Sequence, residues 1–458
     1  MAKPLVPNDV TMLVERFDRS REGQKRTLGR TLLLAVLLAS VLAAGCARRP
    51  SAQQADDRGA TPEGVSQVVA ANNEFACKLY AQLKDAPSNI FFSPFSISTA
   101  LAMTYEGARG QTAEEMRSVL GLPEDARTRR SAFARIFNRL NARDTVCKLS
   151  AANALWTQKG HQFLSSYLDV TSRYYSGRAS DLDFRHSPEE SRLTIDQWAA
   201  RQTRGEIRDF VSDVAIDTMT RLVLTNAIYF KGKWAEEFDK KYTADAGFRI
   251  GPNSSVKVPM MVQQSTLPYA EANGLQILEL PYRNGPDRAG NRTENLGSQP
   301  APVRPGETSM LILLPRTGDL RPLEDSLTIQ NLTEWRKQLR NEDVEVGLPK
   351  FRVEQKVELR KALTALGMKS AFDMAMADFS GMREHDSLFI GDVIHKAVVE
   401  TDEQGTVAAA ATADIIYEGE APHFRFFRAD HPFIFIIQER ESGSILFIGR
   451  VENPALGN

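Results

Sequence analysis

The residues that most often carry enzymatic chemistry occur in this chain without the spacing that such chemistry requires. The six histidines are scattered, and no two of them stand at the separation typical of metal ligands. The chain has no phosphate-binding loop ending in Gly-Lys-Ser/Thr, no His-Glu-x-x-His and no Gly-x-Ser-x-Gly motif. A catalytic triad built from residues far apart in the sequence stays an alternative, because such triads are recognised by their geometry and not by their order along the chain. The missing motifs argue only weakly that the protein is not an enzyme, and this argument gains weight once another pattern explains the same residues. The sequence predicts neither a cofactor nor a metal site.

One segment near the C-terminus has an unusual composition. Residues 403–413 read Glu-Gln-Gly-Thr-Val-Ala-Ala-Ala-Ala-Thr-Ala. An alternating strand pattern at 394–401 leads into this run, and a mixed stretch then connects it to an apolar hairpin that starts near Phe433. By composition alone the alanines would form a short surface helix, because alanine is the best helix former. Whether the alanine run forms such a helix therefore has to be judged from the elements on either side of it.

Those elements alternate between helices and strands along most of the chain. Helical periodicity begins at about Val65, and Pro94 suits the start of a second helix over 95–105. The two apolar runs near the C-terminus do not alternate cleanly, so both faces of that hairpin should be buried. A loop over 283–307, rich in Gly, Pro, Asn and Arg, is expected to be exposed. The other expected elements are helices at 112–120, 129–140 and 188–203, and strands at 90–92, 149–156, 222–229, 309–314, 343–348, 433–438 and 445–451.

Six motifs of the chain resemble the serpin family and follow its order. Residues 89–97 read Asn-Ile-Phe-Phe-Ser-Pro-Phe-Ser-Ile, and residues 224–234 read Leu-Thr-Asn-Ala-Ile-Tyr-Phe-Lys-Gly-Lys-Trp. The resemblance runs from about Val65 to Pro454, and it implies an α+β serpin fold with three β-sheets, eight or nine helices and an exposed reactive-centre loop. The other motifs are Leu-Pro-Lys-Phe at 348–351, Asp-Phe-Ser-Gly-Met at 378–382, Asp-His-Pro-Phe at 430–433 and the family hinge, Glu-x-Gly-Thr-x-Ala-Ala-Ala-x-Thr, at 403–412.

The resemblance implies a suicide inhibitor of extracellular serine proteases. In that mechanism the protease cleaves the exposed loop, the N-terminal part of the loop enters a sheet as an additional strand, and the acyl-enzyme is trapped. Every second inserted side chain must fit behind a sheet that was closed, so small residues avoid both overpacking and the burial of charge. The alternative is a non-inhibitory serpin that acts as a surface binding or structural lipoprotein. The implied hinge residues are Glu403, Gly405, Thr406, Ala408, Ala409, Ala410, Ala411 and Thr412.

Two control regions are implied by the same resemblance. At the shutter, where the sheet parts, buried Ser, Asn and His side chains should form a satisfied hydrogen-bond network. At the breach, where insertion starts, a Lys–Glu pair beneath an aromatic ring would hold the top of the sheet. The shutter residues are Ser93, Ser96, Asn226 and His395, and the breach residues are Trp234, Lys350 and Glu403.

The family's spacing from the hinge places the reactive bond between Gly419 and Glu420. The distance back from the C-terminal hairpin also permits Tyr417, Glu418 or Ala421 at the bond. Glycine before the bond would suit an elastase-like or subtilisin-like protease with a small pocket, and glutamate would suit a Glu-specific protease. Aromatic residues at 424, 426 and 427 lie beyond the bond and are further candidates for contact with the protease.

The N-terminus has the pattern of an export signal. Basic residues precede an apolar run at 31–44, which is short for a membrane span. The run ends in Leu-Ala-Ala-Gly-Cys, which resembles the lipobox of bacterial lipoproteins and implies a lipid on Cys46, although Ala43 stands where leucine is preferred. A plain secretory signal and an N-terminal membrane helix are the alternatives. The expected parts are a lipoprotein signal peptide at 1–45, a flexible tether at 46–64 and a serpin domain at 65–456, with a surface insertion at 283–307 and the hinge and reactive-centre loop at 403–428.

Charge and cysteine content bound the partners and the compartment. A formal net charge of -1 argues against a nucleic-acid partner, which would usually need a basic face. The expected partners are a target serine protease, in a covalent acyl complex, and a membrane reached through the lipid. We expect an exported monomer facing the periplasm or the cell exterior. Cys77 and Cys147 could pair in such a compartment or remain as two buried thiols.

Overall fold

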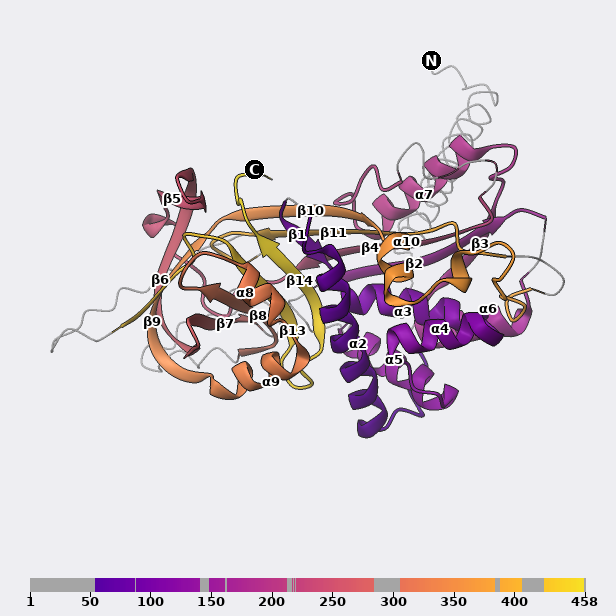
Figure 1. Ribbon diagram of the computed structural model, residues 1–458, viewed down its shortest axis with the longest axis horizontal. Helices are drawn as coiled ribbons and strands as arrows, with labels where there is room; N and C mark the ends of the chain where they lie inside the picture. Colours follow the sequence, from indigo (N-terminus) through magenta and orange to yellow (C-terminus); the bar gives the residue numbers. More distant parts are fainter. Residues whose placement is uncertain are drawn as a thin grey trace, which may run out of the picture. The chain divides into compact units, whose positions relative to one another are not determined.

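The computed structural model describes residues 54–86, 88–140, 148–160, 163–211, 216, 218, 220–283, 305–383, 388–405 and 424–456. These residues form nine α-helices and two hydrogen-bonded sheets, which confirms the expected α+β fold (Figure 1). No helix among them has the length and apolar composition needed to cross a bilayer. The helices are α2 (Pro62–Leu83), α3 (Pro94–Tyr105), α4 (Gly110–Leu120), α5 (Ala126–Leu140), α6 (Ser165–Tyr175), α7 (Pro188–Gln202), α8 (Arg321–Asp325), α9 (Ile329–Gln338) and α10 (Arg360–Leu366).

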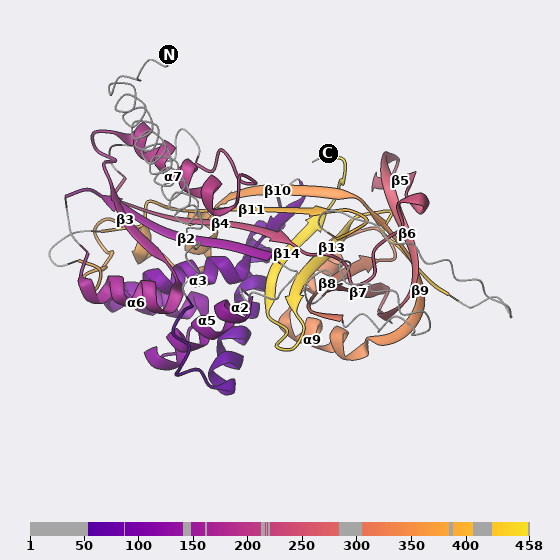
Figure 2. The same ribbon diagram turned by 180° about the vertical axis from the view of Figure 1, so that it is seen from behind.

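The smaller sheet has five strands, and two neighbouring strands inside it, β11 (Asp392–Thr401) and β4 (Leu222–Lys231), run parallel. β11 and β4 pair in parallel from Asp392 opposite Val223 to Val398 opposite Tyr229. β10 and β2 are antiparallel to β11 and β4, respectively. Helices α3 and α6 lie on one face of this sheet and α7 lies on the other (Figure 2). In spatial order the strands are β10 (Phe351–Glu358), β11 (Asp392–Thr401), β4 (Leu222–Lys231), β2 (Lys148–Gln158) and β3 (Arg178–Leu182).

The larger sheet has nine strands, because one long strand joins two of the expected sheets. β6 (Ser254–Ala272) pairs first with β5 (Ala244–Gly251), then with β9, and over its last four residues with β7. Every residue in the two strands of the C-terminal hairpin, β13 and β14, is buried, as its apolar runs predict. The path is β1 (Ile90–Phe92), β14 (Ile445–Val451), β13 (Phe433–Glu439), β8 (Pro305–Pro315), β7 (Leu275–Arg283), β6, β9 (Arg340–Pro349) and β12 (Arg425–Arg428).

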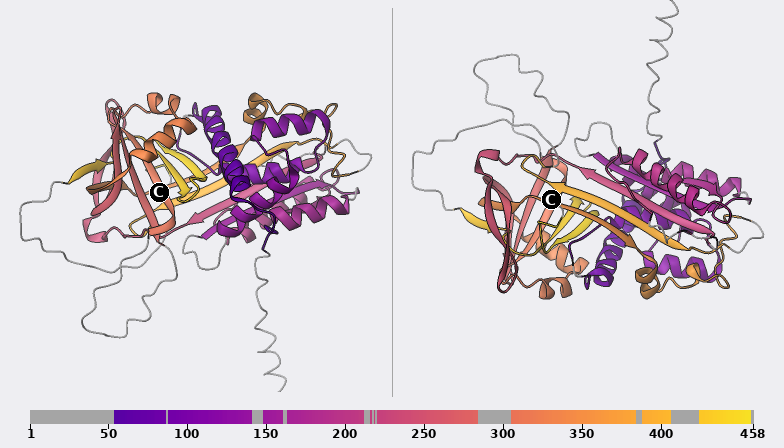
Figure 3. Two further views of the ribbon diagram at one scale, coloured as in Figure 1. Left: turned by 90° about the horizontal axis from the view of Figure 1, so that it is seen from below. Right: turned by 90° about the horizontal axis from the view of Figure 1, so that it is seen from above.

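The two ends of the domain differ in content. Seen from below and from above, helices α3 to α6 lie at one end of the long axis, and the strands β5, β6 and β9 lie at the other (Figure 3). Helix α3 is buried along nearly its whole length and packs against β2, β4 and β14. Its start follows from local chemistry, since the Ser93 hydroxyl accepts from the N–H of Ser96 at 3.2 Å and Pro94 occupies the first turn. This start lies directly under the five-stranded sheet.

The segment before α2 differs from the flexible tether that we expected. Residues 54–61 are placed against helices α5 and α6, and Ala55 is buried. The backbone of Ala55 exchanges two hydrogen bonds with the Asn138 side chain, at 2.9 and 2.8 Å. The Asp56 carboxylate accepts from the Arg173 guanidinium at 2.6 and 2.8 Å. This part of the predicted tether is therefore docked. No local pattern in the sequence indicates the docking, because the binding partners lie far along the chain.

Several predicted features lie outside the described residues. Cys77 is half-buried on α2, and burial raises the pKa of its thiol to about 11. Whether Cys77 pairs with Cys147 stays open, because Cys147 lies outside the described residues. The other features outside the described residues are the signal peptide and Cys46, residues 284–304 of the insertion, the hinge residues Thr406, Ala408, Ala409, Ala410, Ala411 and Thr412, and the candidate bond residues Tyr417, Glu418, Gly419, Glu420 and Ala421.

Candidate functional site

The chain reverses direction directly after β11. Asp402 and Gly405 exchange two backbone hydrogen bonds, each 3.1 Å long, and close a tight turn. Gly405 also forms an antiparallel bridge with Lys233, and the carbonyl of Gln404 accepts from the N–H of Trp234 at 3.0 Å. Lys233 and Trp234 come shortly after the end of β4. The turn therefore places Gly405 between the ends of β4 and β11, with its backbone antiparallel to both strands.

Only glycine fits at this position. Gly405 has a φ of 112°, which side chains of L-residues rarely allow. A Cβ atom there would lie 2.4 Å from the carbonyl oxygen of Gly232 and 2.5 Å from the backbone nitrogen of Trp234. Both contacts are with backbone, so no side-chain rotation would relieve them. The glycine of the hinge motif is thus required by the close approach of two strands as well as by its conformation.

The predicted breach residues meet around this turn. Lys350, which follows β9, donates from Nζ to the buried Glu403 carboxylate at 2.9 Å. Burial has the largest single influence and would raise the pKa of Glu403, but the hydrogen bonds to its carboxylate, led by the one from Lys350, and the charge of Lys350 together hold the pKa below its usual range. The buried indole of Trp234 donates to the carbonyl of Asp402 at 3.0 Å and stacks on Tyr282 with ring centroids 4.6 Å apart. Side chains from three separate parts of the chain therefore secure the turn.

A row of polar side chains crosses the five-stranded sheet at mid-height. His395 on β11 lies opposite Asn226 on β4, and Asn226 lies opposite Asn153 on β2. The Asn226 amide donates to Asn153 Oδ1, and His395 Nδ1 lies 2.5 Å from Asn226 Oδ1. The bond between His395 and Asn226 spans the parallel pair of strands. Any strand that entered between β4 and β11 would have to break it.

The N-terminus of α3 completes this network from below. The backbone N–H of Ser93 donates to His395 Nε2 at 3.0 Å, so Nε2 is the unprotonated nitrogen and Nδ1 donates to Asn226. The Asn226 amide also donates to the hydroxyl of Ser96, and the Ser93 hydroxyl donates to the carbonyl of Leu446 on β14 at 2.6 Å. The structure thus brings together all four predicted shutter residues. Complete burial lowers the pKa of His395 to about 3, so the imidazole is neutral.

Asn153 is a member of the network that the sequence reasoning missed. It lies within the apolar run that predicted a strand over 149–156, where the residues around it are alanine, leucine and tryptophan. A polar amide in the middle of such a strand needs a buried partner, because an unpaired amide in a core is costly. That isolated polar residue was a signal, but its partner is set by strand order and could not be named from the sequence.

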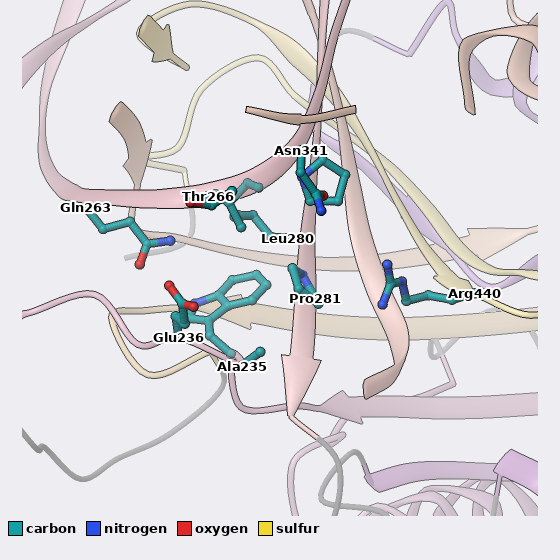
Figure 4. Close-up of a pocket in the computed structure, with 11 residues that line it drawn as sticks. Ala235, Glu236, Gln263, Thr266, Leu280, Pro281, Asn341 and Arg440 are labelled. Atoms are coloured by element: carbon teal, nitrogen blue, oxygen red, sulfur yellow. The ribbon is translucent and has the colours of Figure 1, made fainter. Parts of the chain in front are cut away.

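A cavity of about 250 Å³ lies next to the breach (Figure 4). The Trp234 side chain forms part of its wall, together with residues of β6, β7 and the start of β9. Its two charged lining residues are already paired, Arg440 with Glu279 at 3.0 Å and Glu236 with Ser265. Within the described residues, no group of three His, Cys, Asp or Glu side chains could hold a metal ion.

The geometry has the features of a seam that can open. The parallel ladder between β4 and β11 is this seam. The hydrogen bond between His395 and Asn226 crosses the seam at mid-height and acts as a first latch. The pair of Lys350 and Glu403 closes its top and acts as a second latch. Parallel pairing is slightly weaker per residue than antiparallel pairing. The chain that leaves β11 has already turned back into the top of this seam.

Comparison with known proteins agrees with this geometry. The family profile described as Serpin (serine protease inhibitor) matches residues 70–454. A serpin-like protein of Thermococcus kodakarensis is 43% identical over 395 residues, which cover 85% of this chain and 86% of that protein. Leukocyte elastase inhibitor A of Rattus norvegicus is 38% identical over 404 residues, which cover 85% and 100%. The crystal structure of uncleaved ovalbumin has a TM-score of 0.74 at 30% identity and covers 85% of this chain and 100% of that one. The chain therefore belongs to the serpin family.

Proposed function

We propose that this serpin inhibits serine proteases by offering residues 403–428 as bait and by taking the cleaved loop into the five-stranded sheet between β4 and β11. The observation that carries the proposal is the position of Gly405, which bridges Lys233 after β4 while it closes the turn with Asp402 after β11. A strand that continued from Gly405 along the seam would be antiparallel to both neighbours, and it would therefore exchange one parallel ladder for two antiparallel ones.

The exchange is favourable in free energy. An inserted strand of about ten residues would add on the order of ten backbone hydrogen bonds, each with a net contribution of about 1 kcal/mol. Against this stands the cost of parting β4 from β11 and of breaking the latch between His395 and Asn226. By strand parity, Thr406, Ala408, Ala410 and Thr412 would share one face, and their small side chains limit that cost. Cleavage removes the restraint that keeps the loop outside.

The bait sequence favours a protease with a small specificity pocket. Our preferred bond is Gly419–Glu420, and glycine before the bond suits an elastase-like or subtilisin-like enzyme. The name of the rat relative refers to inhibition of an elastase, which supports the same class of protease. The protein is consumed in a one-to-one covalent complex, so the hydrolytic chemistry belongs to the target protease and not to this chain.

The N-terminal sequence extends the proposal to the cell envelope. We propose that the signal is removed before Cys46, that Cys46 carries the lipid, and that the serpin domain faces the periplasm or the cell exterior. Expression of the full chain and of a Cys46→Ala variant tests this, with incorporation of a labelled fatty acid as the measurement. Label on the wild type and none on the variant is the expected result, and label on neither protein would contradict the lipid.

The inhibitory mechanism is tested with a panel of serine proteases. We expect a complex that survives denaturing electrophoresis with at least one elastase-like or subtilisin-like protease. Cleavage of the loop by every protease, without a stable complex, would favour the non-inhibitory alternative. Mass spectrometry of the released C-terminal peptide identifies the bond, and a cut outside residues 417–421 would overturn the assignment.

Two variants separate insertion from mere cleavage. Thr406→Arg places a charged side chain on the face that must enter the sheet, so this variant should be cut as a substrate. Val407→Arg changes the neighbouring residue, which faces the opposite way in an extended strand, and it should still form the complex. A complex of undiminished yield with Thr406→Arg would contradict the proposed insertion. The melting temperature should also rise after a single cut in the loop.

A further inference from the structure

The strand that follows the bait loop carries the most exposed large hydrophobic side chain of the described residues. Phe426 on β12 is 68% exposed, whereas its neighbour Phe427 is completely buried in the core. A single exposed aromatic is not unusual on a protein surface. This one lies on the last strand of its sheet path, two residues after the point where the described chain resumes at Phe424.

The backbone that presents Phe426 is fixed. β12 pairs in parallel with β9 from Arg425 opposite Val344 to Arg428 opposite Gly347. The carbonyl of Phe426 also accepts a hydrogen bond from the Gln276 side chain at 2.8 Å. An aromatic side chain on a fixed backbone loses little conformational entropy on binding, which is a property of binding anchors.

The surroundings of Phe426 form a surface of defined chemistry, which we call the exit-strand patch. Its members are Phe426 and Arg428 on β12, Glu345 opposite Phe426 on β9, and Gln264 opposite Glu345 on β6. The Gln264 amide donates to Glu345 at 2.8 Å, so the carboxylate is already engaged. Phe426 and Arg428 are both exposed and share one face by strand parity. The patch fits a partner with an apolar hollow and an acidic group beside it.

Chain length brings the bound protease within reach of this patch. Glu420 of the proposed bond precedes Phe426 by six residues, which span at most about 20 Å when fully extended. A protease domain of roughly 200 residues has a radius of gyration of about 16 Å, and its outer surface extends further still. A protease that holds the bond in its active site therefore lies within reach of the end of the domain that carries β12.

We propose that the exit-strand patch is a docking surface for the body of the target protease, with Phe426 as its anchor. The inference rests on the proposed inhibitory function and names residues that set its specificity. Aromatic residues and arginine are enriched at interfaces and among the residues that dominate binding energy. The contact forms in the first complex, before cleavage. It is lost when insertion carries the acylated protease away, so the patch governs how fast a protease is captured and not whether it is trapped.

The test compares Phe426→Ala with a matched control in the full mature protein. Met374→Ala removes an apolar side chain that is 62% exposed and lies in a different part of the chain. Against the protease that the wild type inhibits fastest, Phe426→Ala should lower the second-order rate constant on the order of 10- to 30-fold. Met374→Ala should leave that constant within twofold. The stoichiometry of inhibition and the melting temperature should be unchanged in both variants.

The outcomes distinguish this inference from the proposed function. If Phe426→Ala retains the wild-type rate constant while the covalent complex still forms, the docking surface is refuted and the inhibitory function stands. If the wild type forms no covalent complex with any protease, both are refuted. A Phe426→Tyr variant should recover most of the rate, because it keeps the ring.

Discussion

The neutral, fully buried His395 makes the stability of the protein depend on pH in a way that one substitution can isolate. Its pKa is lowered to about 3 by burial, and no carboxylate is among its hydrogen-bond partners, which are Ser93 and Asn226. In His395→Gln, the side-chain amide can accept from Ser93 and donate to Asn226 in the same plane, but it does not titrate. The variant therefore keeps both hydrogen bonds of the latch and removes the group that can take up a proton.

The size of the effect follows from the two pKa values. In the unfolded chain a histidine titrates near 6.5, so below that pH the unfolded state takes up a proton that the folded state does not bind until about pH 3. The free energy of unfolding contributed by this residue therefore falls as the pH falls through 6.5. Between pH 7.5 and 4.5 the loss amounts to about 2.7 kcal/mol, and it levels off below pH 3.

Urea unfolding of the intact protein, followed by tryptophan fluorescence at several pH values, measures this loss. The carboxylates titrate alike in both proteins, so the difference in unfolding free energy between wild type and His395→Gln removes their contribution. That difference should shrink by about 2.7 kcal/mol from pH 7.5 to 4.5, after a cost to the variant of about 1–3 kcal/mol at neutral pH. Parallel pH curves for the two proteins would refute the argument, since they would mean that His395 ionises as readily when folded as when unfolded.

Three further substitutions have definite expected outcomes. Gly405→Ala should destabilise the turn by about 1–3 kcal/mol and slow complex formation, because alanine is strained at the φ of 112° that this position has. Urea unfolding curves and rates of complex formation equal to those of the wild type would contradict this. Glu403→Gln removes the charged partner of Lys350, so the intact protein should lose inhibitory activity faster on warming. Titration of the remaining inhibitor with protease over time measures this loss. An unchanged half-life of inhibitory activity would contradict the role of the Lys350–Glu403 pair as a latch. Asp56→Asn breaks the docking onto Arg173, so calorimetry should find a lower melting temperature at low salt and a smaller difference at high salt. A difference independent of salt would point to a cause other than the ion pair.

Local patterns in the sequence predicted the parts of the fold that depend on neighbouring residues. Ser93 and Pro94 predicted the start of α3, and the two apolar runs predicted the buried hairpin of β13 and β14. The glycine of the hinge predicted backbone freedom at a turn, but not that Gly232 and Trp234 leave no room for a Cβ atom. That restriction comes from two segments that are far apart in the chain.

Features that depend on strand order could not be predicted from the residues alone. Asn153 belongs to the latch only because β2 lies beside β4, and two expected sheets merge because β6 is long enough to pair with β5, β9 and β7 in turn. The docked position of Asp56 depends on Arg173, more than a hundred residues away. The exposure of Phe426 beside a buried Phe427 likewise follows from the register of β12 on β9, since the two aromatics are equivalent in composition.

The docked segment before α2 also determines how the molecule would be moored. It is fastened to α5 and α6 at one end of the domain, whereas β12 and the exit of the bait lie toward the other end (Figure 3). A lipid on Cys46 would be joined to this fastening by a stretch that reaches at most about 30 Å. If Cys46 carries the proposed lipid, this short connection would keep the helical end of the domain within about 30 Å of the anchored residue, and β12 would be the more distant end.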